Sequence, residues 1–171
     1  MNYTIQAMSQ KQAEEIAANW HYAGEYSFYD MDADQEDLQA FLDQKMRKES
    51  YFIIKQNNEV IGFYSFIPVG NNTIDIGLGM KPNLTGNGKG FEFLKVGLDF
   101  AKSKYDPEQI ILSVATFNKR AIKVYKKIGF KEVEYFMQTT NGGNFEFLKM
   151  IYVCKERTPI KEDKMSIEEK L

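Results

Sequence analysis

Cysteine and histidine are almost absent from the sequence, with Cys154 and His21 the only residues of their kinds among 171. A single cysteine excludes a disulfide bond within the chain and is typical of a reducing compartment, so we expect a cytoplasmic protein. The same scarcity excludes a zinc site made of cysteine and histidine ligands, and we expect no metal ion. We expect Cys154 to serve packing and His21 to be structural or simply exposed.

Long apolar runs are also missing. No stretch approaches the roughly 20 apolar residues that a membrane helix needs, and the first ten residues lack the basic and apolar segments of a secretory signal. The 22 basic and 24 acidic residues give a net charge of -2, which does not provide the basic surface typical of nucleic-acid-binding domains. We therefore expect neither a membrane nor a nucleic acid as a partner.

What the sequence does contain fits one folded domain. Apolar residues make up 43% of the chain and charged residues 27%, as in ordinary soluble proteins of this length. We place a single domain at residues 1–154. The dense charge at the end of the chain then predicts a charged C-terminal extension over residues 155–171.

The first half of the chain shows the periodicities of a strand, two helices and three more strands. Ser9 is placed as the N-cap of a helix that reaches about Trp20, and residues 21–32 have no clear period. Apolar residues at spacings of 3 and 4 predict the second helix over residues 34–47. Strands are expected over residues 2–7, 51–55, 60–69 and 73–80.

The second half begins with a long helix over residues 88–105 that is apolar on two faces, so we expect it to be buried. The nearly continuous apolar run at residues 110–117 is typical of a central or parallel strand. A strand, a buried helix and a strand in succession imply a right-handed parallel crossover within a mixed sheet, which gives a mixed α+β fold. A short helix at residues 118–128 and two strands, over residues 130–139 and 145–153, complete the chain.

Three glycines at alternate positions, Gly86, Gly88 and Gly90, precede the long helix. Glycine allows unusual backbone angles and the close approach of a ligand, and the amides that begin a helix favour an anion. The loop predicts a phosphate site, and a flexible connection is the alternative. A dinucleotide fingerprint is excluded because Phe91 stands where a third small residue is needed, and a Walker A loop because Lys89 is followed by glycine.

The helix expected at residues 118–128 adds positive charge near this loop. At about 100° per residue its cations fall within an arc of about 120°, and they are Lys119, Arg120, Lys123, Lys126 and Lys127. Such an arc is either a solvated basic face or a surface that meets phosphate. Lys89, in the loop itself, is open to the same two interpretations.

Together these segments resemble the GNAT superfamily of acyl-CoA-dependent N-acyltransferases over about residues 50–140. The loop pattern of that family, Arg/Gln-x-x-Gly-x-Gly/Ala, falls on residues 85–90, with Thr85 in place of the usual Arg or Gln. Its second pattern is present as Asn118, Ala121, Tyr125, Gly129 and Phe130. The resemblance implies a central mixed, mostly antiparallel sheet with splayed parallel strands and helices on both faces.

The resemblance also implies the ligand, acetyl-CoA, as a cosubstrate. Its pyrophosphate would lie on the amides of residues 86–91, and its pantetheine arm would pair with the backbone of residues 78–80. The cofactor-binding residues are then expected to be Leu78, Gly79, Met80, Thr85, Gly86, Asn87, Gly88, Lys89, Gly90, Phe91, Asn118, Ala121 and Lys127. The acetyl group would pass directly to an amine, without an acyl-enzyme.

Direct transfer needs two groups that handle protons. Tyr125 matches the family position of the acid that serves the leaving thiolate, and a core tyrosine is the alternative. Asp75 interrupts an apolar strand ahead of the pantetheine segment and is the candidate base. An outward-facing strand residue, with a water chain as the base, is the alternative for Asp75.

The acceptor side is expected in residues 12–44, which contain nine carboxylates and no Lys or Arg. In the family the first two helices and their connection wall the acceptor site. Acidic and aromatic side chains attract a cationic amine, and the candidates for binding it are Glu25, Tyr26, Tyr29 and Asp30. The alternative is that the acids cap the second helix and the aromatics belong to the core.

The predicted function is that of an acetyl-CoA-dependent N-acetyltransferase. Its acceptor would be a small amine, such as a polyamine or an aminoglycoside, or a protein N-terminus. A catalytically silent CoA-binding regulatory protein is the alternative. A nucleic-acid-binding module would rest on the basic face alone, and the net charge counts against it. A homodimer is left open.

Overall fold

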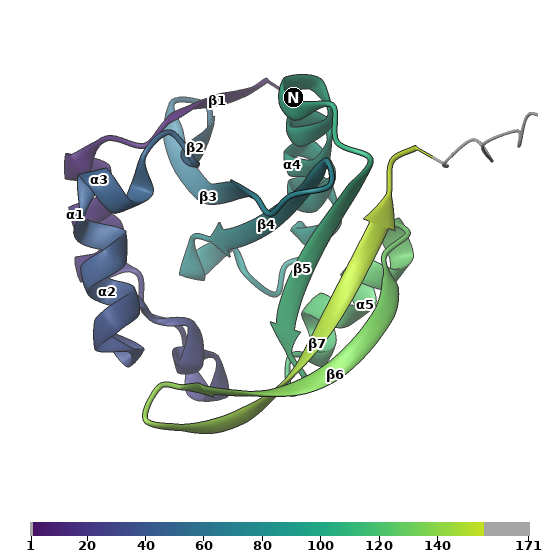
Figure 1. Cartoon of the computed structure of the whole chain (residues 1–171). Helices are drawn as coiled ribbons and strands as arrows, with labels where there is room; N and C mark the ends of the chain where they lie inside the picture. The colour runs from purple at the N-terminus through teal and green to yellow at the C-terminus, as the bar shows by residue number, and fades with distance from the viewer. Residues whose placement is uncertain (1, 156–171) are drawn as a thin grey trace, which may run out of the picture.

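The computed structural model describes residues 2–155 and places their seven strands in one mixed sheet (Figure 1). The spatial order is β1-β2-β3-β4-β5-β7-β6. The strands are β1 Tyr3–Ala7, β2 Tyr51–Gln56, β3 Glu59–Pro68, β4 Thr73–Met80, β5 Gln109–Ala115, β6 Lys131–Thr140 and β7 Gly143–Val153. Among these described strands only β4 and β5 pair in parallel, so the expected mixed, mostly antiparallel sheet is confirmed.

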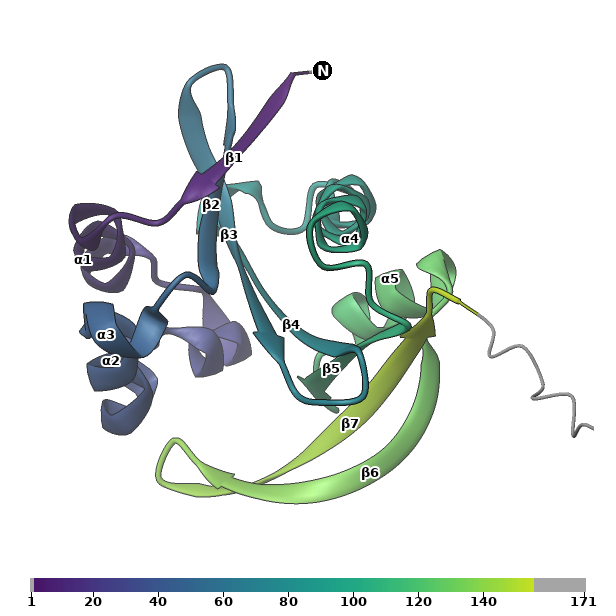
Figure 2. The ribbon, with the colours of Figure 1, turned by 45° about the horizontal axis from the view of Figure 1, so that its top comes forward.

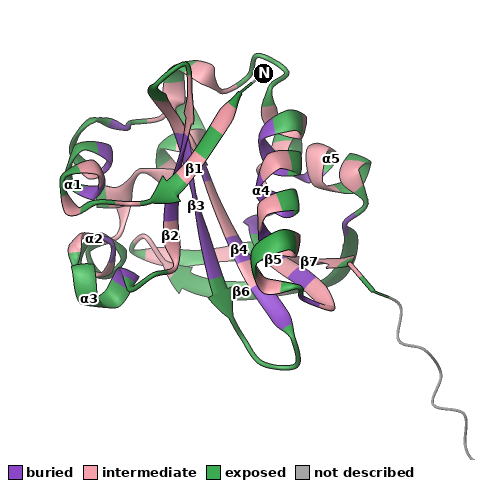
Figure 3. Ribbon diagram, turned by 90° about the horizontal axis from the view of Figure 1, so that it is seen from above, coloured by how far each residue is buried: buried purple, intermediate pink, exposed green. Residues whose placement is uncertain are grey.

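Helices cover both faces of this sheet, as Figures 2 and 3 show. On one face, α1 Gln10–Asn19, α2 Gln35–Leu42 and α3 Gln44–Arg47 pack over β2 and β3. On the other, α4 Gly90–Tyr105 and α5 Lys119–Ile128 cover the larger core. The short 3-10 helices are η1 Gly24–Tyr29, η2 Met31–Ala33 and η3 Pro82–Leu84. No helix among the described residues is long and apolar enough to cross a membrane.

The parallel pair β4–β5 is short. Its register joins Thr73–Asp75 to residues 109–111 and then stops. Beyond this point β4 continues beside β3 and β5 continues beside β7, so the two strands move apart. The expected splay of the parallel strands is therefore confirmed, and it leaves two inner strand edges without a strand partner among the described residues.

Local signals set most element boundaries where the sequence predicts them. Ser9 forms a capping box with Gln12 at the start of α1, and Asn118 caps α5 by accepting a hydrogen bond from the amide of Ala121. The helix expected over residues 34–47 is in fact two helices. Asp43 breaks it, because its backbone is extended and its side chain caps α3.

Two other predictions change in detail. The long helix begins at Gly90 rather than at residue 88, because Gly86 and Gly88 adopt positive φ angles of 76° and 75° that a helix does not allow. The segment without a clear period contains η1 and η2. Apart from Lys155, the predicted C-terminal extension lies outside the described residues.

Candidate active site

A cleft of about 810 Å³ passes through the split between β4 and β5. On one face of the sheet the glycine-rich loop, α4 and α5 line it, and we call this part the α5 side. On the other face α1, η1 and α2 line it, and we call this part the α2 side. The cleft thus joins both faces of the sheet at the point where the backbone of β4 and β5 is open.

The glycine-rich loop forms an open concavity on the α5 side. A Cβ atom at Gly88 would meet nothing within 4 Å, and one at Gly86 would come within 3.0 Å of the Arg120 guanidinium. No side chain caps the first amides of α4. Uncapped amides at a helix start, reinforced by the helix dipole, provide donors for an anion.

Not every predicted loop residue belongs to the cleft. Thr85, Gly86, Gly88, Gly90 and Phe91 line it, whereas Asn87 and Lys89 do not. The Thr85 hydroxyl donates to the carbonyl of Pro82 at 2.7 Å. Its hydroxyl is therefore engaged at the end of η3, although the residue lines the cleft.

The cations of α5 divide into two groups. Arg120, Lys123 and Lys127 line the cleft, whereas Lys119 and Lys126 do not. Lys127 Nζ lies 5.2 Å from the centre of the Phe91 ring, beside the glycine loop. Lys126 instead pairs with Glu132 at 2.8 Å on the surface. The part of the basic arc that faces the cleft is placed to meet an anion.

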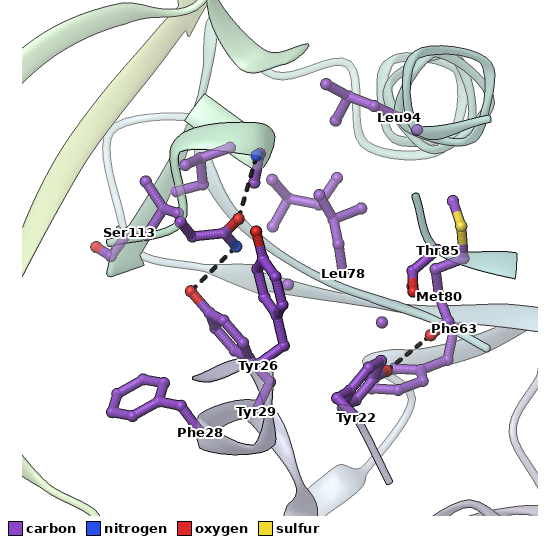
Figure 4. A pocket seen from close by; sticks show the side chains of 18 of the residues that line it. Tyr22, Tyr26, Phe28, Tyr29, Phe63, Leu78, Met80, Thr85, Leu94 and Ser113 are labelled. Carbon is purple, nitrogen blue, oxygen red and sulfur yellow. Dashed lines mark hydrogen bonds between the residues drawn. The ribbon is translucent and has the colours of Figure 1, made fainter. Parts of the chain in front are cut away.

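Tyr125 lies where the cleft meets the core. It lines the cleft and also packs edge-on against Phe130, with 5.9 Å between the ring centres. Burial and the nearby Tyr29 raise the pKa of Tyr125 well above its usual value, so its hydroxyl keeps its proton at neutral pH. Asn118 fixes this region, since it caps α5 and donates to the Tyr29 hydroxyl at 3.2 Å (Figure 4).

The segment between α1 and α2 is tied to the end of β4. The Tyr22 hydroxyl donates to the carbonyl of Met80 at 2.7 Å (Figure 4), and burial raises the pKa of Tyr22 to about 12. Asp30 accepts from the Tyr22 amide at 2.8 Å and lies 3.2 Å from His21 Nδ1. Asp30 lines the cleft, but its carboxylate is already engaged by this segment.

The other predicted acceptor residues are not all at the cleft. Tyr26 and Tyr29 line it, and the Arg120 guanidinium lies 4.4 Å from the centre of the Tyr26 ring. Glu25 is exposed and does not line the cleft. His21, Asp30 and Asp32 bring ligand atoms within 4.8 Å of one another, so the absence of a metal stays a prediction.

The β6–β7 hairpin adds a wall to the α2 side, because Gln138, Thr140 and Asn141 line the cleft. The Asp34 carboxylate caps α2, in line with the alternative interpretation of the acidic segment, and also accepts from the amide of Asn141 at 3.0 Å. The Asn141 side chain donates to the carbonyl of Phe28 at 2.8 Å. Because Asn141 lies in the turn between β6 and β7, this turn is held against η1 and the start of α2.

The structure does not bring Asp75 into the cleft. Its side chain is half-buried where β4 still pairs with β5, and it is absent from the lining. Burial raises the pKa of Asp75, and the charge of Lys149 opposes this.

Asp37, Tyr51 and Ser65 are among the polar residues of the α2 side that sequence reasoning missed. A serine inside the apolar run of residues 60–69 was the available signal for one of them.

Comparisons with known proteins agree with this geometry. A model of the acetyltransferase (GNAT) family matches residues 12–130. No curated protein sequence matches the chain significantly.

Several solved structures share the fold at low sequence identity. A spermidine N-acetyltransferase from Vibrio cholerae in complex with CoA and spermine has a TM-score of 0.68 and 15% identity, over 88% of this chain and 95% of that one. The spermidine/spermine N-acetyltransferase SpeG from Vibrio cholerae in complex with manganese ions has a TM-score of 0.66 and 18% identity, over 88% and 92% of the two chains. A chimera of that SpeG and hSSAT has a TM-score of 0.67 and 18% identity, over 88% and 95%.

Proposed function

The chain belongs to the acetyltransferase (GNAT) family, and we propose that its acceptor is a small cationic amine that binds on the α2 side of the cleft. As a member of this family it is an N-acetyltransferase that uses acetyl-CoA. In the proposed reaction the amine nitrogen attacks the thioester carbonyl carbon. The carbon–sulfur bond then breaks, CoA leaves as a thiolate, and the extra proton on the nitrogen passes to that sulfur, so that the products are the amide and the CoA thiol.

Acetyl-CoA is proposed to bind on the α5 side. The open glycine loop and the uncapped start of α4 support a pyrophosphate on the amides of residues 86–91. Arg120, Lys123 and Lys127 add positive charge along the same side. The pantetheine arm would lie along residues 78–80 of β4, whose inner edge has no strand partner among the described residues.

Tyr125 is proposed to act on the departing sulfur. A thiol has a reference pKa of about 8.5, and the pKa of Tyr125 lies above the ordinary tyrosine value. Complete proton transfer from Tyr125 to a thiolate is therefore uphill. The hydroxyl contributes instead as a hydrogen-bond donor to the negative charge that develops on sulfur.

The distribution of charge within the cleft supports the proposed class of acceptor. All the lysine and arginine residues that line it come from α5. The α2 side offers the carboxylates of Asp30 and Asp37 and an aromatic wall that includes Trp20, Tyr22 and Phe41. Carboxylates and aromatic rings favour a cation. The spermidine acetyltransferases that share the fold make polyamines the first candidates.

A protein N-terminus is the second candidate acceptor. Asn141, in the turn that is held by Asp34 and Phe28, lines the cleft, and a fixed wall on this side favours a small amine over an extended peptide. Several residue roles stay predictions. They are the binding of CoA by Asn87 and Lys89, the binding of the acceptor by Glu25, and the action of Asp75 as the base. So do a single domain over residues 1–154, a cytoplasmic location and a homodimer.

The loop assignment predicts that Gly88→Val weakens acetyl-CoA binding at least about tenfold, or ~1.4 kcal/mol. A branched side chain would fill the space that the pyrophosphate needs. Gly70→Val is the matched control, because Gly70 also has a positive φ and open surroundings but lies outside the cleft lining. Calorimetric titration with acetyl-CoA measures both variants. If both variants bound acetyl-CoA equally well, the pyrophosphate would not bind at this loop.

The proposed role of Tyr125 predicts that Tyr125→Phe lowers kcat about 10–1000-fold, the range of typical acid–base and electrostatic contributions, with little change in acetyl-CoA affinity. Tyr152→Phe is the control, since Tyr152 also packs on Phe130 but does not line the cleft. Steady-state and pre-steady-state kinetics separate chemistry from product release. An unaltered chemical rate in Tyr125→Phe would contradict the role.

The acceptor class is tested with a panel of amines, in which release of the CoA thiol reports turnover. We expect diamines and polyamines to be acetylated in preference to neutral amines and peptides. Their KM should rise with ionic strength because salt screens exposed charges beyond ~10 Å at 0.1 M. Acetylation of peptides in preference to every small cation would contradict the proposal.

A further inference from the structure

The proposed reaction requires that the acceptor ammonium lose a proton, and β4 provides no group for it at the split. The two positions of β4 that face the α2 side there are Gly77 and Gly79. A Cβ added to Gly79 would strike the Phe63 ring, and one added to Gly77 would strike the Ser65 side chain. Asp75, on the same face, lies outside the cleft lining. The proton must therefore pass to a neighbouring element.

Ser65 is the polar side chain closest to this gap. It lies on β3 directly opposite Gly77 in the register and is only 8% exposed. Because Gly77 has no side chain, the Ser65 hydroxyl lies against the backbone of β4 just past the last β4–β5 pair. It lines the cleft on the side from which the acceptor is proposed to enter.

Tyr51 continues the path behind Ser65. The two residues are cross-strand partners on β2 and β3, and the Ser65 hydroxyl interacts with the Tyr51 side chain in the direction that lowers the pKa of Tyr51. The Tyr51 ring packs edge-on against Phe41, with 5.8 Å between their centres. Burial raises the pKa of Tyr51, so the hydroxyl does not ionise on its own and can only give a proton as it accepts one.

Asp37 supplies a carboxylate beyond Tyr51. It lines the cleft, and its negative charge contributes to the raised pKa of Tyr51, whereas Arg47 of α3 acts in the opposite direction. Partial burial and the charges of Asp34 and Glu36 raise the pKa of Asp37 itself, which makes it a better proton acceptor than an ordinary aspartate. Within the described part of the chain no donor is bonded to its carboxylate.

We propose that Ser65, Tyr51 and Asp37 form the route by which the acceptor ammonium is deprotonated. Ser65 Oγ accepts a proton from the ammonium and gives its own to the Tyr51 oxygen. The Tyr51 proton passes to the Asp37 carboxylate, either directly or through one water molecule. The ammonium becomes a neutral amine, Asp37 becomes a carboxylic acid, and Ser65 and Tyr51 end unchanged. Because Asp37 is exposed, it returns the proton to solvent.

This inference rests on the proposed function, in which the acceptor binds as a cation. It assigns a catalytic contact to Ser65 alone, while Tyr51 and Asp37 act through it. Asp30, the other carboxylate in the cleft lining, is less suited because the Tyr22 amide and His21 already occupy it.

The test compares Ser65→Ala, Tyr51→Phe and Asp37→Asn with a control, Glu15→Gln, which removes an exposed carboxylate of α1 outside the cleft lining. At pH 7 we expect kcat/KM for a strongly basic amine to fall about 10–100-fold in the three variants, within the range of general-base contributions. Glu15→Gln should retain the wild-type value. Thermal denaturation and acetyl-CoA affinity should be unchanged in all four.

Two further readouts separate proton transfer from a structural role. With trifluoroethylamine, which is neutral at pH 7, kcat/KM of each variant should lie within about threefold of the wild-type value. The same is expected for the basic amine when the pH is raised to its own pKa of about 10. The double variant Ser65→Ala/Tyr51→Phe should be no slower than the slower single variant, because both residues lie on one path.

Equal losses for ammonium and neutral acceptors, or losses that multiply in the double variant, would overturn the route. Wild-type activity that is confined to neutral amines or peptides would instead overturn the proposed acceptor class. The two failures are therefore distinguishable within one set of assays.

Discussion

The early end of the parallel pairing between β4 and β5 is the constraint on which the whole site depends. After Asp75 and its partner Ile111, each strand keeps only its outer neighbour. Backbone donors and acceptors on the two inner edges then need partners, and an extended ligand can supply them as an added strand would. The cleft is therefore a consequence of strand register, and loops and helices only shape its two ends.

Contacts across the open end compensate for the missing strand pairing. Phe28 of η1 packs against Phe117 and Phe145 at ring distances of 5.4 and 4.9 Å, and aromatic pairs of this kind contribute about 0.5–1.5 kcal/mol each beyond their buried area. The His21 side chain is half-exposed in its contact with Asp30, and the contact is an ion pair only when His21 is protonated, so solvent screening leaves it a small contribution. The aromatic contacts thus dominate, and they join the segment before α2 to β7 and to the turn that follows β5.

Much of the fold and one half of the site follow from local sequence patterns. The positive φ angles of Gly86 and Gly88, the cap at Asn118 and the position of Tyr125 are encoded within a few residues, so the sequence predicts the α5 side well. The α2 side depends on contacts between distant segments. The pairing of Tyr51 with Ser65 and the contact of Asp34 with Asn141 span 14 and 107 residues, and no local pattern predicts them. Because side chains alternate along β4, the sequence places Asp75 on the same face as Gly77 and Gly79. Only the register shows that Asp75 lies where β4 and β5 still pair, before the cleft opens.

The account is tested most directly by a crystal structure of the protein with CoA and an acceptor polyamine bound together. It predicts the pyrophosphate within hydrogen-bonding distance, about 3 Å, of the amides at the start of α4, with the pantetheine arm between β4 and β5. It also predicts an acceptor nitrogen on the α2 side, facing the Ser65 hydroxyl. CoA bound outside the split, or an acceptor that enters from the α5 side, would contradict the account.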